Sequence, residues 1–232
     1  MTTLTNDQIR QLNMYSTYVS QPQHPLFTLE QLHQVDIIPV IKTVTGIDKD
    51  AVAASYFMRR YGMFVSTQFV MFITYEEMWM GKANQVQFGA INEYGNMSVS
   101  TFISPIDYQD TSSFSPKELV HHILHEQIQP MIHALRNYSS VSPLTLWENV
   151  FGFMLWHFHV LLNTTSTSEM AREVLDLLKE DDMWTGISSH SLFATYLKGS
   201  EPSLLLNTKI RTTCCFSKDV PGLQACGFCP LL

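Results

Sequence analysis

The chain has 232 residues, of which 45% are hydrophobic and 15% charged, and its net charge is −7. These proportions exclude a disordered chain and allow one large or two small hydrophobic cores. The acidic balance, with no dense basic stripe, argues against nucleic-acid binding, and no uninterrupted apolar run is long enough to span a bilayer. Because the first residues also show no secretory leader pattern, we expect a cytoplasmic protein with no stable membrane insertion.

The first part of the chain contains helical patterns. Thr5 is a good cap for a helix within residues 5–20, and a second short helix is expected over residues 28–33. Residues 51–80 form a long segment whose apolar positions recur at helical spacing. Gly62 and several β-branched residues predict a break inside this segment.

The next part of the chain has the pattern of strands. Residues 86–91 and 97–103 alternate apolar and polar side chains, which is typical of half-buried strands. The intervening residues, 92–96, include asparagine and glycine, which favour tight turns. The sequence therefore predicts an antiparallel β-hairpin near residues 86–103.

Three helices and a short strand are expected in the second half. Ser115 begins a capping box, so a helix should run from there to about Asn137. Helices are also expected over residues 142–162 and from Ser166 or Ser168 to about Lys179, and a short strand over residues 204–212. These elements predict an α+β fold: a mostly helical domain over residues 1–207 with a small antiparallel sheet, followed by a C-terminal segment over residues 208–232.

All four cysteines of the chain lie in its last 19 residues: Cys214, Cys215, Cys226 and Cys229. In a reducing compartment such a cluster favours a metal site or a redox function over structural disulfides. A Cys-x-x-Cys turn presents two thiolates on one side, as around zinc and iron–sulfur sites. Residues 220–222 can turn the chain back so that the second pair faces the first.

The adjacent pair, Cys214 and Cys215, bears on which group is bound. Neighbouring residues of an extended segment point to opposite faces, so they converge poorly on one tetrahedral zinc ion. A two-iron cluster offers two metal centres and accommodates such a pair more easily. From the residues alone, three alternatives stay open: an iron–sulfur cluster, a zinc site and a redox-active disulfide.

Arg211, followed after two residues by Cys-Cys, ten residues and Cys-x-x-Cys, resembles the C-terminal signature of the ferric-siderophore reductase family of the FhuF type. The resemblance implies that all four cysteines bind an unusual [2Fe–2S] cluster in residues 208–232, and that residues 1–207 bind the siderophore. It implies an oxidoreductase that reduces siderophore-bound Fe³⁺ by one electron and releases Fe²⁺. The partners would be a ferric siderophore and an external electron donor, such as a ferredoxin or a flavin-dependent reductase. The alternative is a ligand-binding or structural protein with a Cys₄ zinc knuckle.

An anionic ferric chelate would need cations near the cluster, and residues 198–219 carry four cations and two anions. Positive charge there would attract the substrate and favour the reduced cluster, which we expect to lie near the surface. Paired arginines on an apolar helix are further candidates, because guanidinium groups match carboxylate and hydroxamate oxygens; the ordinary alternative is surface ion pairing. The substrate-binding candidates are Arg211, Lys209, Lys218, Arg59 and Arg60.

Histidines form two further groups. His121 with His125, and His122 with Glu126, stand at the i, i+4 spacing used by metal ligands. We interpret this stretch as a partly exposed polar helix face. Two others lie in the apolar helix expected over residues 142–162 and are interpreted as core or pocket-wall histidines: His157 and His159.

Overall fold

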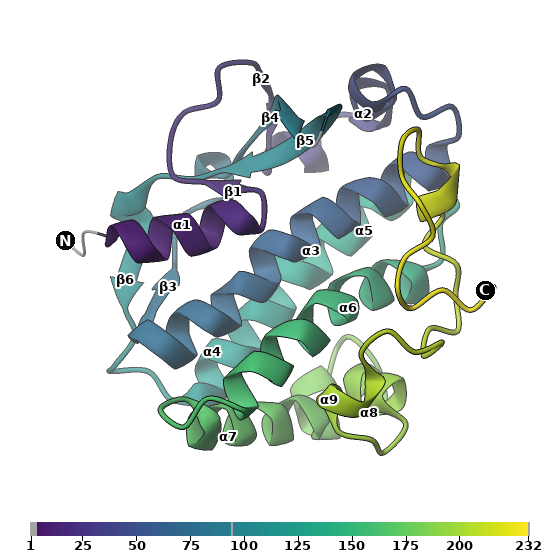
Figure 1. Cartoon of the computed structure of the whole chain (residues 1–232). Coiled ribbons are helices and arrows are strands. Elements are labelled where there is room, and N and C mark those ends of the chain that lie inside the picture. Colours follow the sequence, from purple (N-terminus) through teal and green to yellow (C-terminus); the bar gives the residue numbers. More distant parts are fainter. Residues whose placement is uncertain (1–3, 94, 232) are drawn as a thin grey trace.

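The structure is a computed structural model that describes residues 4–93 and 95–231. Two long helices, α3 (Asp50–Tyr75) and α6 (Pro143–Leu162), pack against each other at its centre (Figure 1). A Cβ atom on Gly62 of α3 would lie only 3.3 Å from the Val150 backbone of α6, so the glycine allows the two helices to approach closely. Helix α3 is continuous, and the predicted break near Gly62 is therefore wrong, because this glycine serves helix packing instead.

A four-stranded sheet and helix α2 (Ile38–Thr45) lie above α3 in Figure 1. The predicted hairpin is confirmed, since β4 and β5 pair antiparallel; Tyr94, in the predicted turn, lies outside the described residues. Strand β1 pairs parallel with β5, so the sheet is mixed and not wholly antiparallel as predicted. The strand order is β1 (Thr17–Tyr18), β5 (Asn96–Phe102), β4 (Gln87–Glu93) and β2 (Pro25–Thr28).

Several helical predictions were too long. Helix α1 covers only Asn6–Met14, and the predicted helix at residues 28–33 is reduced to a 3₁₀ turn over Gln31–His33. Helix α3 ends where Glu76 adopts a left-handed φ of 53°. The residues that follow form a two-stranded antiparallel sheet from β3 (Glu77–Trp79) and β6 (Tyr108–Asp110).

The helix predicted from Ser115 to Asn137 is present, but its middle is wound differently. Helix α4 (Pro116–His122) passes into a π-helical turn (Ile123–Ile128) and then into α5 (Gln129–Tyr138). Pro130, just inside α5, has no backbone N–H and crowds the carbonyl four residues before it. The wider π turn accommodates this proline without ending the helix.

The last helices lie at the lower end of the molecule in Figure 1: α7 (Ser168–Lys179), α8 (Leu192–Leu197) and α9 (Pro202–Leu205). Helices α6 and α7 agree with the predicted segments. The strand predicted over residues 204–212 is wrong, because α9 ends at Leu205 and irregular backbone follows. The α+β class is confirmed. Of the helices in the described residues, none is long and apolar enough to cross a membrane.

His157 of α6 is a core histidine. Its ring packs on Tyr15 with centroids 4.4 Å apart, and among the described residues its Nε2 atom has no hydrogen-bond partner. Burial lowers the pKa of His157 from 6.5 to about 3. Between these two values the unfolded chain binds a proton that the folded protein does not, so the free energy of unfolding falls as the pH falls below 6.5.

We expect His157 to lower the free energy of unfolding by about 2 kcal/mol between pH 6.5 and pH 5. The variant His157→Phe keeps an aromatic ring against Tyr15 and removes this titration. Urea unfolding of both proteins at the two pH values measures the difference. The same pH dependence in both proteins would contradict the assignment of this effect to His157.

Candidate functional site: the cysteine tail

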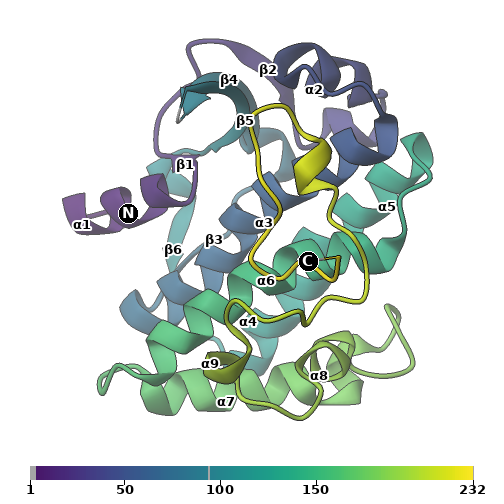
Figure 2. The ribbon, with the colours of Figure 1, turned by 45° about the vertical axis from the view of Figure 1, so that its right-hand side comes forward.

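The C-terminal segment, residues 206–231, is called the cysteine tail here. It runs across the first halves of α3 and α6 and forms only one short 3₁₀ turn, Ser217–Asp219 (Figure 2). The tail contains all four cysteines, so the contacts that hold it on the two helices also position the thiols.

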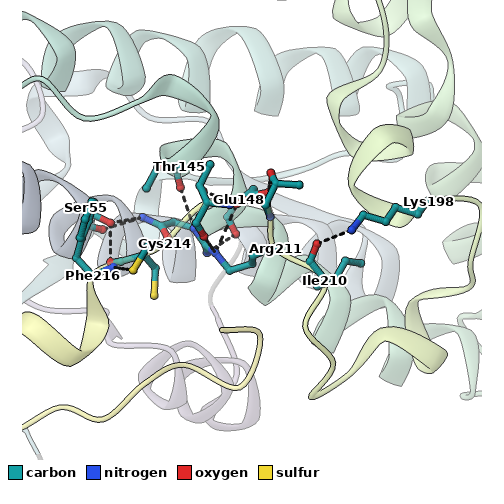
Figure 3. Close-up of polar contacts among 12 residues, drawn as sticks. Ser55, Thr145, Glu148, Lys198, Ile210, Arg211, Cys214 and Phe216 are labelled. Carbon is teal, nitrogen blue, oxygen red and sulfur yellow. Dashed lines mark hydrogen bonds and ion pairs between the residues drawn. The ribbon is translucent and has the colours of Figure 1, made fainter. Parts of the chain in front are cut away.

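Glu148 of α6 anchors the start of the tail (Figure 3). Its buried carboxylate accepts hydrogen bonds from the backbone N–H groups of Thr212 and Thr213, at 2.9 and 3.0 Å, and from both hydroxyl groups. The Nε atom of Arg211 lies 3.6 Å from this carboxylate, and the guanidinium also donates to the carbonyls of Thr145 and Glu148, at 3.3 and 3.0 Å. A side chain therefore satisfies the backbone N–H groups of Thr212 and Thr213, where the predicted strand would have ended.

A second anchor holds the backbone of Cys215. Ser55 of α3 donates its hydroxyl to the Cys215 carbonyl at 2.9 Å, and Asn149 of α6 donates its amide to the carbonyl and hydroxyl of Ser55. Ser55, Asn149 and Glu148 were not among the residues predicted from the sequence. Glu148 and Asn149 are adjacent polar residues in an otherwise apolar helix, and this signal could have identified them.

Ser217 links the two halves of the tail. Its hydroxyl donates to the Gln224 carbonyl at 2.8 Å and accepts a hydrogen bond from Arg59 of α3 at 2.7 Å. Farther along, the ring of Phe228 lies against Gly152 of α6, where a Cβ atom would meet the ring at 3.4 Å. These contacts fold the tail back on itself, so that the Cys-x-x-Cys turn approaches the Cys-Cys pair.

Cys215 and Cys226 lie near each other where the tail folds back, close enough for their thiol groups to interact. Mainly this interaction, aided by the charges of Arg59 and Arg211, lowers the pKa of Cys215, while burial opposes it. The same interaction, together with burial, raises the pKa of Cys226. The pair therefore loses its first proton readily and its second with difficulty.

The Phe216 N–H donates a hydrogen bond to Cys214 Sγ at 3.3 Å, and the N–H groups of Ser217 and Phe228 lie near Cys215 and Cys226 and favour their thiolate forms. Such bonds stabilise thiolates and support cysteines that bind metals. To make this turn, Phe216 adopts a left-handed φ of 58°, which is uncommon for an aromatic residue. Each donor lies two residues after its cysteine: Phe216 for Cys214, Ser217 for Cys215 and Phe228 for Cys226.

The four thiols fit a sulfur-ligated group by donor type, since thiolates are the ligands that zinc and iron–sulfur clusters share. Cys215 and Cys229 are 4% and 6% exposed, whereas Cys214 and Cys226 are half-buried, so the site reaches the surface. Within residues 4–93 and 95–231, no three His, Cys, Asp or Glu side chains lie close enough together to hold one metal ion. The suitability of the four cysteines for a zinc ion or an iron–sulfur cluster therefore rests on their sulfur ligands and on the N–H groups directed at sulfur.

The predicted substrate-binding cations occupy three kinds of environment. Arg211 is buried and holds the start of the tail, as described above. Arg60 pairs with Glu93 of β4, and Arg59 is half-buried beside Ser217. Arg59 and Arg211 thus lie close to the thiols, and substrate contact stays a prediction for all five residues. The two remaining cations are exposed on the tail: Lys209 and Lys218.

Two hollows, of about 230 and 210 Å³, lie between the tail, the β4–β5 hairpin and α3. Arg59 and Arg60 line the second hollow. Because Arg59 also contacts Ser217, this side chain joins the hollows to the thiol site. The lining residues that the two hollows share are Tyr56, Asn96, Ser98 and Leu223.

The histidine group lies apart from the tail. The rings of His121 and His125 stack with centroids 4.0 Å apart, and a ring nitrogen of His125 bonds the Met183 carbonyl at 3.0 Å. His121, His122 and Glu126 line a hollow of about 700 Å³ to which the tail contributes no residue. These side chains are exposed or half-buried, as predicted for a polar helix face.

In the metal-free protein, we expect mild oxidation with diamide to join Cys215 to Cys226, because their thiols lie close enough to interact. Two thiols lose two electrons and two protons to the oxidant. Trypsin cleaves after Lys218, so the linked peptides and their fragment ions identify the bridge by mass spectrometry. Cys214→Ser should keep the bridge and Cys226→Ser should lose it; a predominant Cys214–Cys215 bridge would contradict the geometry.

The fold and the tail define an α+β protein in which two central helices present a four-cysteine segment at the surface. Neither a scan against models of protein families nor a search of curated proteins finds a match to this chain. A function is therefore inferred from the residues of the cysteine tail.

Proposed function

We propose that this protein is a ferric-siderophore reductase that binds a [2Fe–2S] cluster through Cys214, Cys215, Cys226 and Cys229. One observation carries the proposal: the tail folds back so that Cys215 and Cys226, from the two halves of the cysteine pattern, lie close enough to interact. The resemblance of this pattern to the FhuF type supplies the reaction class. A bound cluster would supply transfer of one electron at a time.

The chain's own groups would prepare the site for this role. The N–H groups two residues after three of the cysteines favour their thiolate form, as do the charges of Arg59 and Arg211 at Cys215. Positive charge and hydrogen bonds near sulfur also favour the reduced state. The half-buried positions of Cys214 and Cys226 leave a short path for an electron from a donor protein.

The hollows beside Arg59 are the best-placed site for an anionic ferric chelate. The Arg59 guanidinium lies between the hollow that it lines and Ser217, so a chelate bound there would lie close to the cysteine pair. Exposed Lys218 and Lys209 add positive charge to the approach. The protein need break no covalent bond: one electron from a ferredoxin or flavin-dependent reductase converts Fe³⁺ to Fe²⁺, and the hard oxygen ligands hold Fe²⁺ weakly.

The test is the ultraviolet–visible spectrum of anaerobically purified protein, with iron and acid-labile sulfide assayed on the same sample. About two irons and two sulfides per chain, with visible bands that dithionite bleaches, support the proposal. Oxidation of the reduced protein by ferric siderophores then tests the substrate. A colourless protein with stoichiometric zinc would replace the reductase with a structural Cys₄ zinc knuckle.

A further inference from the structure

Helix α6 has large apolar side chains on its exposed face. Phe153, Trp156 and Val160 follow one another at helical spacing, so they lie on one face of the helix; this set is called the α6 stripe. Trp156 is 39% and Val160 58% exposed, and Phe153 is half-buried. Glu148, which is buried, is the only Asp, Glu, Lys or Arg in α6, so the stripe has no charged neighbour on its own helix. Large apolar side chains exposed together on one face are typical of an interaction surface.

The surface around the α6 stripe is hollowed at both ends. Phe153 lines one hollow of about 210 Å³, and Val160 lines another of about 210 Å³. Two tyrosines, Tyr15 and Tyr75, also line the hollow at Val160. An apolar face between two hollows can accept side chains of a partner protein, and a tryptophan at its centre is the residue type that contributes most to such interfaces.

One end of the α6 stripe lies beside the cysteine tail. The ring of Phe228, which precedes Cys229 in the chain, lies against Gly152 of α6, and Phe153 is the next residue of the helix. Phe153 also lines the same hollow as Leu223 of the tail. The tail crosses the first half of α6 (Figure 2), and the stripe continues the surface beyond it. A protein bound to the stripe would therefore lie next to the segment that carries the thiols.

The charges at this end favour an acidic partner. Residues 198–219 carry four cations and two anions, although the whole chain has a net charge of −7. Lys209 and Lys218 are exposed on the tail, and Arg59 lines the hollow at Phe153. Positive charge beside an apolar surface attracts an acidic protein and orients it. The same charges disfavour a symmetric pair of these chains, because the two copies would bring their positive tails together.

We propose that the α6 stripe is the docking surface for an acidic electron-donor protein. This inference rests on the proposed function for the electron that is transferred, whereas docking itself depends only on the apolar and charged groups of this chain. The donor would lose one electron to the group held by the cysteine tail and then dissociate. Interfaces for electron transfer are small, which suits a surface one helix wide. Because the donor can leave before the ferric chelate arrives, their shared use of the surface near Phe153 does not prevent turnover.

The test measures the binding of an acidic plant-type ferredoxin to the full chain by isothermal titration calorimetry. Trp156→Ala should weaken binding by about tenfold or more, because it removes the largest side chain of the α6 stripe. The matched control is Phe114→Ala, since Phe114 is also an aromatic residue and is 40% exposed. Phe114 lines the hollow at His121 and His122, to which the tail contributes no residue, so this variant should bind as the wild type does.

Two replacements of Val160 test the charge of the partner. Val160→Glu should weaken binding more than Val160→Lys does, because only glutamate repels an acidic protein. The side chain is exposed, so both variants should fold as the wild type does. Binding should also weaken as the salt concentration is raised from about 20 mM to about 200 mM. Unchanged binding in Trp156→Ala and Val160→Glu, or equal effects of glutamate and lysine, would overturn the inference.

Further outcomes separate the docking surface from the proposed function. No binding of the ferredoxin at about 1 mM would overturn the inference. Self-association in analytical ultracentrifugation that Trp156→Ala abolishes would also overturn it, because the α6 stripe would then bind a second copy of this chain. A protein without iron and sulfide after reconstitution would overturn the proposed function, whereas the calorimetric measurement needs no iron and tests the docking surface by itself.

Discussion

Replacing Glu148 with alanine is expected to lower the free energy of unfolding by about 3–5 kcal/mol and to release the start of the cysteine tail. The side chains of Glu148 and Arg211 are 2% and 3% exposed, so the variant leaves a buried guanidinium without its counter-charge. It also removes the acceptor for the N–H groups of Thr212 and Thr213. Urea unfolding followed by circular dichroism measures the loss, and an iron assay of the purified protein measures its effect on the site.

Glu201→Ala is the matched control. Glu201 also pairs with an arginine, Arg172, but the two side chains are 50% and 46% exposed, so its loss should cost less than about 1 kcal/mol. The double variant Glu148→Leu with Arg211→Met removes both buried charges and should recover part of the stability. If Glu148→Ala were no less stable than Glu201→Ala, Glu148 would not be the anchor of the tail.

Local signals were sufficient to predict some elements. The β4–β5 hairpin follows from alternation around a glycine-containing turn, and the start of α7 follows from a serine at residue 166 or 168. The predictions failed where contacts between residues far apart in the sequence, and not local sequence preferences, determined the backbone structure. Gly62 breaks no helix because it packs on Val150, and residues 204–212 form no strand because α9 takes up their start and Glu148 binds the Thr212 N–H at their end.

The candidate site, like the fold, could be predicted from the sequence only in part. The four cysteines could be selected from spacing alone, because no other cysteine occurs in the chain. Their supports could not, since Ser55 and Glu148 reach the tail from helices about 160 and 65 residues away along the chain. Arg211 illustrates the difference: its charge predicts a substrate contact, which stays a prediction, whereas only the structure shows that it is buried and bonds the Glu148 carbonyl.

Cys226→Ser is expected to remove most of the iron from the protein and to lower the rate of ferric-chelate reduction by about 100-fold or more, since even supporting residues around a metal change affinity by 10–100-fold. Serine is nearly isosteric and Cys226 is half-buried, so stability of the metal-free protein should change little. Iron, sulfide and the visible spectrum report the loss. Lys218→Gln, exposed between the two cysteine pairs, is the control and should keep its iron.

The four serine variants taken together separate a cluster from a simple thiol pair. If all four cysteines bind one [2Fe–2S] cluster, Cys214→Ser and Cys229→Ser should lose iron as Cys226→Ser does, although neither residue takes part in the interaction between Cys215 and Cys226. A redox-active thiol pair would need only those two cysteines. Full activity in both Cys214→Ser and Cys229→Ser would therefore exclude a cluster bound by four cysteines. Equal loss of iron in all four variants would instead mean that the tail closes further when the cluster binds.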